Sequence, residues 1–303
     1  MTTTPAVIDV RGLVKRFGRF TAVDGLNLTV APGAVHGFLG PNGAGKTTTI
    51  RVLLGLYRAA AGSARVLGMD PARQSAAINR RISYVPGDVH LWPNLTGHQC
   101  LDALAGLRGA RDESAERRLT EDFALDVRKS VRAYSKGNRQ KVILVAAFAA
   151  PTDLLILDEP TTGLDPLMEE VFRRCVRDAV AAGRTVLLSS HILGEVEQLC
   201  DAVTIVKDGR LVESGRLTDL RHLAASRITA QLTGPQSTTV TNGLRDLGLV
   251  NGDGAGTDLV LSVPRTQVLP VLALLARADA GDITCTPASL EELFLRHYRV
   301  AAR

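Results

Sequence analysis

Cysteine is scarce in this 303-residue sequence, and the few cysteines that occur are far apart. They form no Cys-x-x-Cys pair and are Cys100, Cys175, Cys200 and Cys285. This spacing argues against a disulfide framework and against a zinc site. We expect all of them to be small buried hydrophobic groups in a reducing compartment.

Long apolar runs are also absent. The longest one, residues 142–150, stops at Pro151 and falls well short of the ~20 residues that a membrane-spanning helix needs. The first five residues do not follow the charged-then-apolar pattern of a signal peptide. These two observations predict a cytoplasmic protein.

No block of like charge occurs, although the net charge is +5 and the pI is near 9.2. Residues 111–122 alternate acidic and basic side chains instead, which predicts an exposed helix of mixed charge. Because a basic cluster is missing, we expect no nucleic-acid partner. Aromatic residues make up only 4%, whereas 45% hydrophobic and 22% charged residues are typical of a folded globular protein. The length predicts about two domains.

The most informative stretch is a glycine-rich loop that fits the pattern Gly-x-x-x-x-Gly-Lys-[Ser/Thr]. It comprises Gly40, Pro41, Asn42, Gly43, Ala44, Gly45, Lys46, Thr47 and Thr48. Glycines let successive backbone N–H groups turn toward phosphate oxygens, and the following helix directs the positive end of its dipole at the same anion. Lys46 would then contact the β and γ phosphates, and the Thr47 hydroxyl would ligate Mg²⁺.

A chance match in a glycine-rich turn is the alternative interpretation of this loop. The flanking residues argue against it, because residues 34–39 have the pattern of a strand and residues 48–56 that of a helix. The stretch therefore predicts a nucleoside triphosphate site.

A second apolar run, residues 154–158, ends in two adjacent carboxylates, Asp158 and Glu159. In a phosphate-loop protein such a strand lies beside the loop, so Asp158 is placed to hold Mg²⁺. Glu159 is placed to polarise the attacking water as a general base. The alternative interpretation is that the two acids merely end a strand at the solvent. The four apolar residues before them argue against this interpretation.

The remaining pattern predicts an α/β fold with a P-loop NTPase core, an antiparallel β subdomain, a helical insertion and a small C-terminal α/β appendage. Core strands are expected at 6–15, 23–30, 34–39, 81–86, 154–158 and 185–189, with a hairpin-like piece at 62–68 and a β-hairpin across 202–213. Core helices are expected at 48–56, 98–107, 112–125, 166–182 and 192–200. We place the nucleotide-binding domain at 1–221 and its helical subdomain at about 88–138.

The accessory domain is expected over residues 222–303. Its predicted elements are strands at 228–232, 259–263 and 283–286, helices at 239–247 and 266–277, a loop at 251–256 and an amphipathic, capped helix at 289–298. The domain is either a cap that stabilises a dimer, which we favour, or a regulatory ligand domain.

The order of several motifs resembles that of the nucleotide-binding subunit of ATP-binding cassette (ABC) transporters. The matching segments are residues 40–48, 154–159, 161–166 and 189–191, within a resemblance that covers roughly residues 6–215. The resemblance implies ATP and Mg²⁺ as ligands, Phe17 as the aromatic that stacks on adenine, and His191 as the residue that contacts the γ phosphate. It also places Asp165 in the nucleotide site and makes Lys46, Glu159 and His191 the catalytic residues.

Two motifs depart from the pattern of that family. The signature loop, usually Leu-Ser-Gly-Gly-Gln, is here the run Tyr-Ser-Lys-Gly-Asn at 134–138, in which Ser135, Gly137 and Asn138 are expected to contact nucleotide bound by a second subunit. Where the family usually has Gln after Tyr-Val-Pro, this chain has Gly87 followed by Asp88. We hypothesise that the Asp88 carboxylate takes over part of that role near Mg²⁺.

The resemblance implies partners as well as a site. Two cassettes would hold two ATP between them as a homodimer or a cassette heterodimer, and an integral-membrane permease would bind the helical insertion. The tail after Ser289 and the segment around Trp92 resemble the branch that exports drugs, antibiotics, polysaccharides and lipids. The expected location is therefore peripheral, on the inner face of the cell membrane.

Two other functions stay open at this point. One is a soluble cassette ATPase of translation or DNA repair, although such chains usually carry two cassettes or a long coiled coil. The other is a regulatory cassette protein with weak hydrolysis, which the altered signature loop and the missing Gln would suit.

Overall fold

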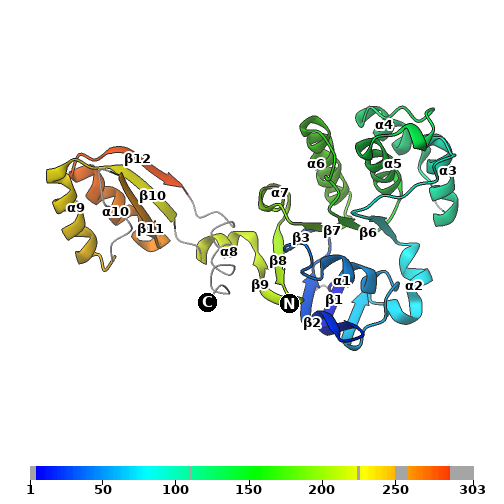
Figure 1. Ribbon diagram of the computed structural model, residues 1–303, viewed down its shortest axis with the longest axis horizontal. Coiled ribbons are helices and arrows are strands. Elements are labelled where there is room, and N and C mark those ends of the chain that lie inside the picture. The colour runs from blue at the N-terminus through cyan, green and yellow to red at the C-terminus, as the bar shows by residue number, and fades with distance from the viewer. Residues whose placement is uncertain (1–4, 110, 224–225, 250–257, 287–303) are drawn as a thin grey trace. The chain divides into compact units, whose positions relative to one another are not determined.

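The computed structural model describes residues 5–109, 111–223, 226–249 and 258–286. The chain divides into two compact units, residues 1–215 and 216–303, and each is described by itself (Figure 1). The boundary lies after Gly215, whereas the sequence analysis places it after residue 221.

A six-stranded sheet forms the centre of the first unit. In spatial order its strands are β5 (Ile82–Val85), β6 (Leu154–Asp158), β7 (Thr185–Ser190), β3 (Val35–Leu39), β8 (Ala202–Lys207) and β9 (Arg210–Arg216). The first five strands are parallel, and every residue of β3, β6 and β7 is buried. Continuous apolar runs suit strands that are covered on both faces. The turn before β9 is Asp208–Gly209, and the positive φ angles of both residues, 50° and 76°, suit a two-residue hairpin.

A second, antiparallel sheet has the order β2 (Phe20–Val30), β1 (Ile8–Phe17) and β4 (Ala61–Val66). The hairpin-like piece expected at 62–68 is found only at its end, where a turn at Leu67 and Gly68 lets Val66 pair with Met69 through two backbone hydrogen bonds of 2.9 Å. The residues before this turn belong to β4 and pair with β1, as in Ile8 opposite Val66. Gly62 has a φ of 80°, and a Cβ there would lie 2.2 Å from the Gly12 carbonyl oxygen. Glycine at this position therefore permits close approach of two strands and does not form the tip of a turn.

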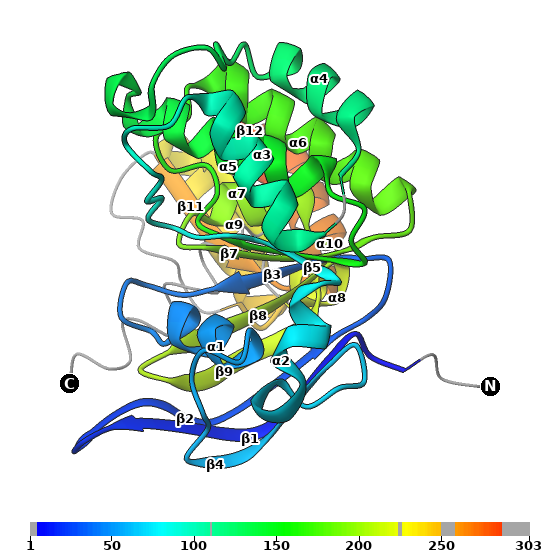
Figure 2. The ribbon, with the colours of Figure 1, turned by 90° about the vertical axis from the view of Figure 1, so that its right-hand side faces the viewer.

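Helices cover both faces of the six-stranded sheet. Their bounds are α1 (Lys46–Leu53), α2 (Pro71–Asn79), α3 (Gly97–Arg108), α4 (Glu113–Asp122), α5 (Lys136–Ala149), α6 (Pro166–Ala181) and α7 (Leu193–Leu199), with a short 3₁₀ turn at Val131–Ala133. Figure 2 shows α1 between the two sheets, with α5, α6 and α7 on the opposite face of the larger sheet. The sequence analysis missed α5 and α2. Helix α2 begins with the side chain of Asp70 accepting the Ala72 N–H and with proline at its first position.

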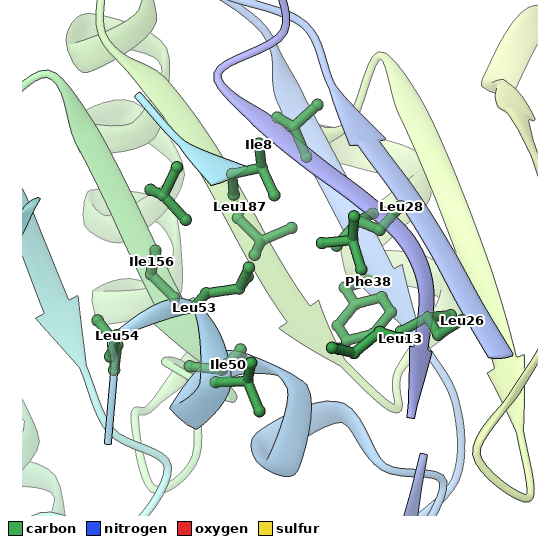
Figure 3. Packing of buried hydrophobic residues seen from close by; sticks show 14 of the residues in the cluster. Ile8, Leu13, Leu26, Leu28, Phe38, Ile50, Leu53, Leu54, Ile156 and Leu187 are labelled. Atoms are coloured by element: carbon green, nitrogen blue, oxygen red, sulfur yellow. The ribbon is translucent and has the colours of Figure 1, made fainter. Parts of the chain in front are cut away.

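The main core lies where the two sheets and α1 meet. Figure 3 shows apolar side chains from both sheets and the helix in one cluster, including Ile8, Leu28, Phe38, Ile50 and Leu187. All five are at most 1% exposed. Burial of such side chains holds α1, and with it the loop before α1, against the ends of β3 and β6.

The second unit has its own sheet and its own core. Its elements are α8 (Leu217–Leu223), β10 (Ser226–Gln231), α9 (Gly234–Asp246), β11 (Asp258–Val263), α10 (Arg265–Arg277) and β12 (Gly281–Thr286), with the antiparallel order β11-β10-β12. Buried Ile228, Val240 and Leu275 belong to its core. Helix α9 begins five residues before the predicted start at 239, because Thr233 caps it and its N–H donates to Gln236. The predicted loop at 251–256 and the predicted helix at 289–298 lie outside the described residues.

Three of the cysteines are buried, as the sequence predicts, and Cys285 is exposed. The expectation for Cys285 is wrong because it lies on β12, an edge strand of a three-stranded sheet, where all six residues are exposed. Over the described ranges, none of the helices combines the length and apolar character that crossing a bilayer requires.

One buried titratable group links the stability of the first unit to pH. The imidazole of His36, on β3, is 4% exposed, and its Nε2 lies 2.8 Å from Thr204 Oγ1. Burial lowers the pKa of His36 to about 4, below its ordinary value of 6.5. The unfolded chain therefore binds a proton more readily than the folded chain between these two values. The resulting contribution to stability is complete above pH 6.5 and is lost as the pH falls toward 4.

We predict that lowering the pH from 7 to 5 removes about 2 kcal/mol of unfolding free energy through His36. Urea unfolding of the parent and of His36→Gln at both pH values measures this contribution, because glutamine does not titrate. The parent should lose more stability than the variant. Equal losses in the two proteins would show that His36 does not couple folding to pH.

Candidate nucleotide-binding site

The phosphate loop connects the end of β3 to the start of α1, and its glycines are required sterically. Gly43 and Gly45 have φ angles of 83° and 96°, and Gly45 caps α1. A Cβ on Gly40 would lie 2.4 Å from the Val206 carbonyl oxygen, and one on Gly45 would lie 2.6 Å from that of Ala22. The loop is thus folded tightly against β8 and β2, with the first turn of α1 following it.

Lys46 is buried at the centre of this loop, with 5% of the residue exposed. Its Nζ donates to the Gly40 carbonyl oxygen at 2.6 Å and to that of Pro41 at 3.2 Å. The same nitrogen lies 3.4 Å from Glu159 Oε1. A buried ammonium group needs such partners, and its charge is held where a bound phosphate would lie.

Asp158 is the last residue of β6 and is 1% exposed. Its Oδ2 accepts a hydrogen bond from Thr47 Oγ1 at 2.8 Å, and its Oδ1 accepts one from Ser189 Oγ. In the part of the chain that the structure describes, no three His, Cys, Asp or Glu side chains form a metal cluster. A cation here would depend on one carboxylate, one hydroxyl and the phosphates of its ligand, which is the coordination that Mg²⁺ favours.

Glu159 has the backbone conformation of a strained residue, with a φ of 47°. Its N–H is held by Ser189, at 3.1 Å from the carbonyl oxygen and 3.3 Å from the hydroxyl. This geometry directs the side chain so that Oε1 meets Lys46 and Oε2 lies 3.4 Å from His191 Nδ1. The structure therefore brings together Lys46, Thr47, Asp158, Glu159 and His191 from three separate segments.

Residues of the altered signature loop contact the loop that follows Glu159. Ser135 caps α5, and its Oγ accepts the Asn138 N–H at 3.2 Å. A Cβ on Gly137 would lie 2.4 Å from the Gly163 carbonyl oxygen, so only glycine permits this packing. Asp165 caps α6 by accepting the Met168 N–H at 3.0 Å.

Three further residues that make contacts in this region were missed by sequence reasoning. The buried Gln140 donates to the Pro160 carbonyl oxygen at 2.8 Å. Ser189 holds both carboxylate residues, and Glu195 accepts hydrogen bonds from Thr161 and Ser190. Glu195 lies four residues after His191, and Gln140 lies two residues after Asn138. Neither position in the sequence indicates which residue the side chain will contact.

Gly87 and Asp88 lie just beyond the end of β5. A Cβ on Gly87 would be 3.2 Å from the Asp158 carbonyl oxygen and 3.7 Å from Glu159 Cβ. Asp88 itself is largely exposed, and its Oδ2 lies 3.1 Å from His90 Nε2. The backbone at 87 is thus adjacent to the site, whereas the Asp88 side chain contacts a surface histidine.

Phe17 is at the end of β1 and is 43% exposed. Its ring meets Tyr57 edge-on at 5.3 Å between centroids, and Lys15 Nζ lies 4.8 Å from the centroid of Phe17. Three other residues of the predicted site also have local partners: the Ser135 hydroxyl accepts the Asn138 N–H, and the Asp88 carboxylate lies beside His90.

Fold and site together define a class of protein. The phosphate loop follows β3, and the buried Asp158 and the partly exposed Glu159 lie at the end of β6, two strands away in the sheet. This is the arrangement of a phosphate-loop nucleoside triphosphatase. The predicted fold class is confirmed.

Comparison with known proteins identifies the family. The sequence profile of the ABC transporter family matches residues 23–162. The daunorubicin resistance ATP-binding protein DrrA3 of Streptomyces coeruleorubidus is 37% identical over 95% of this chain and 94% of its own length. The Nod factor export ATP-binding protein I of Paraburkholderia xenovorans is 34% identical over 96% of each chain. This chain belongs to the ABC transporter family, and it is an ATP-binding, ATP-hydrolysing subunit.

Solved structures agree with this assignment. The ATP-binding subunit of an ABC transporter is 32% identical to this chain and superposes with a TM-score of 0.67, over 72% of this chain and 92% of its own. The cassette MJ0796, solved as a dimer in a post-hydrolysis state with ADP and Pi, has a TM-score of 0.63 over 69% of this chain and 98% of its own. At 20% identity this second likeness shows the fold alone.

We predict that Gly40→Ala lowers the unfolding free energy by about 1–3 kcal/mol, because the new Cβ meets backbone that cannot move aside. Urea unfolding measures this change, and nucleotide binding should weaken in parallel. Gly106→Ala is a matched control, since a Cβ there meets no atom within 4 Å and the position is inside α3. The control should be more stable than the parent by about 0.5–1 kcal/mol. A Gly40→Ala protein as stable as the parent would contradict the steric argument.

Proposed function

We propose that this chain hydrolyses Mg²⁺-ATP as one half of a cassette dimer and drives export of a substrate through a separate membrane permease. The observation that carries the export assignment is the extent of the similarity. The matches to a drug-resistance protein and to a Nod factor export protein cover 95–96% of this chain, and so include the second unit as well as the nucleotide-binding unit. The nucleotide-binding unit alone would not distinguish export from other cassette functions.

In the proposed reaction Glu159 is the general base. Its Oε2 faces His191 and its Oε1 faces Lys46, so the carboxylate lies between the cation of the phosphate loop and the residue after β7. Lys46 and the backbone N–H groups of residues 42–48 bind the β and γ phosphates, and His191 contacts the γ phosphate. Glu159 then accepts the proton of the attacking water, which lies in line with the γ phosphate.

Mg²⁺ would be held by the Thr47 hydroxyl and by Asp158, directly or through water. When bound, this cation neutralises charge on the β and γ phosphates. The close approach of the Gly87 backbone to Asp158 supports a contribution from Asp88 through a metal-bound water. Rotation of the Asp88 side chain away from His90 would be required.

The dimer is proposed because the signature residues contact the loop after Glu159 and not the phosphate loop of their own chain. Ser135, Gly137 and Asn138, at the start of α5, would bind the γ phosphate of ATP held by the partner subunit, where a helix N-terminus favours an anion. Asp165 would lie near the same interface, and exposed Phe17 would stack on adenine of the nucleotide bound by its own loop.

The permease would contact the helical subdomain at about 88–138, and the chain would work at the cytoplasmic face of the membrane. The second unit would stabilise the dimer. Action on the ribosome or on damaged DNA is not favoured, because the matching relatives named here are a drug-resistance protein and an export protein.

We predict that tagged Glu159→Gln protein, incubated with ATP and affinity-purified from detergent-solubilised native membranes, co-elutes with a multi-helix membrane protein at one-to-one ratio. Glutamine removes the general base and should lower the hydrolysis rate by about 10²–10⁴-fold while ATP still binds. The trapped protein should therefore elute as a dimer with ATP present. Glu170→Gln, a carboxylate change at an exposed position of α6, is the control that keeps the parental rate.

Three outcomes would contradict this proposal. A parental rate in Glu159→Gln would remove the assigned base. A monomer at high protein concentration, with no cassette partner in the eluate, would remove the dimer. Recovery only from the soluble fraction with ribosomes or nucleic acid would replace export with a role on those particles.

A separate prediction concerns Asp88. If its carboxylate contributes to the Mg²⁺ site, Asp88→Ala should hydrolyse ATP more slowly and require a higher Mg²⁺ concentration for half-maximal rate. A Mg²⁺ titration of ATPase activity measures both effects. His90→Ala is the control, because it removes only the surface partner of Asp88. Parental activity and parental Mg²⁺ dependence in Asp88→Ala would exclude the contribution.

A further inference from the structure

Glu195 joins the two loops that carry Glu159 and His191. This glutamate is in the first turn of α7, and its two carboxylate oxygens have different partners. One accepts a hydrogen bond from the Thr161 hydroxyl, and the other accepts one from the Ser190 hydroxyl at 2.7 Å. Thr161 lies two residues after Glu159, and Ser190 directly precedes His191. A single side chain therefore connects the backbone segments on both sides of the Glu159–His191 pair.

The partners of Glu195 are themselves fixed. Ser190 Oγ accepts the Ile192 N–H at 2.9 Å, so the residues before and after His191 belong to the same chain of hydrogen bonds. Thr161 is in a turn that is closed by hydrogen bonds from Thr162 N–H to the Glu159 carbonyl oxygen and from Leu164 N–H to that of Thr161. Displacing either hydroxyl would thus move the turn that includes the adjacent site residue.

A carboxylate suits this position better than an amide. It accepts hydrogen bonds on both oxygens at once, and bonds to a charged acceptor are stronger than neutral ones. Glutamine offers one acceptor oxygen and an NH₂ group that donates, so one of the two hydroxyls would have to reverse its direction. If Ser190 reversed, its oxygen would accept from both Ile192 N–H and the amide, and its proton would be left with the more distant Ile192 carbonyl oxygen, at 3.3 Å.

We infer that Glu195 is a positioning residue for ATP hydrolysis, which holds Glu159 and His191 at their 3.4 Å separation. This inference rests on the roles that the proposed function gives to those two residues. Glu195 accepts from Thr161 and Ser190 and has no hydrogen bond to the side chains of Lys46 or Thr47 among the described contacts. It should therefore govern the rate of the chemical step and leave the binding of ATP little changed.

The test uses steady-state ATP hydrolysis by the full chain and its Glu195→Gln variant. We expect kcat to fall about tenfold, as loss of one charge-assisted hydrogen bond would cause, with KM for ATP within about twofold of the parental value. Glu121→Gln, an exposed glutamate on α4, is the matched control and should keep both parameters. Circular dichroism of each preparation establishes the folded fraction, because an inactive fraction alone would lower the apparent kcat and leave KM unchanged.

A double-mutant cycle identifies the connection through Thr161. Thr161→Val keeps a similar shape and removes the hydroxyl, so it should also lower kcat. Because both changes break the same hydrogen bond, the double variant should be little slower than the slower single variant. Thr161→Val also carries the test alone if circular dichroism shows that Glu195→Gln is misfolded.

Failure of this inference is distinguishable from failure of the proposed function. If Glu159→Gln loses hydrolysis while Glu195→Gln and Thr161→Val keep the parental kcat, the positioning role is overturned and the role of Glu159 stands. If Glu159→Gln hydrolyses ATP normally, the proposed function itself fails. A raised KM with unchanged kcat in Glu195→Gln, or fully additive losses in the cycle, would also overturn the positioning role.

Discussion

The first unit depends on the hydrogen-bonded register of three buried parallel strands. Leu39 at the end of β3 pairs with Ser190 of β7, and Asp158 at the end of β6 pairs with Ser189. The strands therefore end at the same level, and segments more than 100 residues apart in sequence meet there, as in the bond from Thr47 to Asp158. A shift of one residue would turn Asp158 to the other face of the sheet and separate it from Thr47.

The parts of this arrangement that sequence predicts are those determined locally. The phosphate loop is recognisable because its glycines, lysine and threonine are consecutive, and each is required by the backbone path or by a nearby charge. The strand before Asp158 is recognisable because it is apolar throughout, as burial on both faces demands. The confirmed fold class and family follow from such local signals taken in order.

The parts that sequence does not predict depend on contacts between distant segments. Nothing near Glu195 indicates that it accepts hydrogen bonds from Thr161, and nothing near Gln140 indicates Pro160. Glycines usually mark turns, and Gly68 does lie in the turn that pairs Val66 with Met69, whereas Gly62 is inside β4 and lets that strand approach β1. In the sequence, Gly87 is notable only because it replaces the glutamine that is usual at this position. The structure shows that its backbone lies close to Asp158, since a Cβ on Gly87 would be 3.2 Å from the Asp158 carbonyl oxygen.

The contacts at the start of α5 have a thermodynamic consequence. Gly137 packs on the Gly163 carbonyl, and Gln140 donates to the Pro160 carbonyl, so the residues proposed to bind the partner's nucleotide are fixed to the loop that follows this chain's own Glu159. In the proposed dimer, nucleotide at one site would therefore change the free energy of binding at the other. Linkage makes such an effect reciprocal, so both sites would show the same coupling energy whichever is filled first.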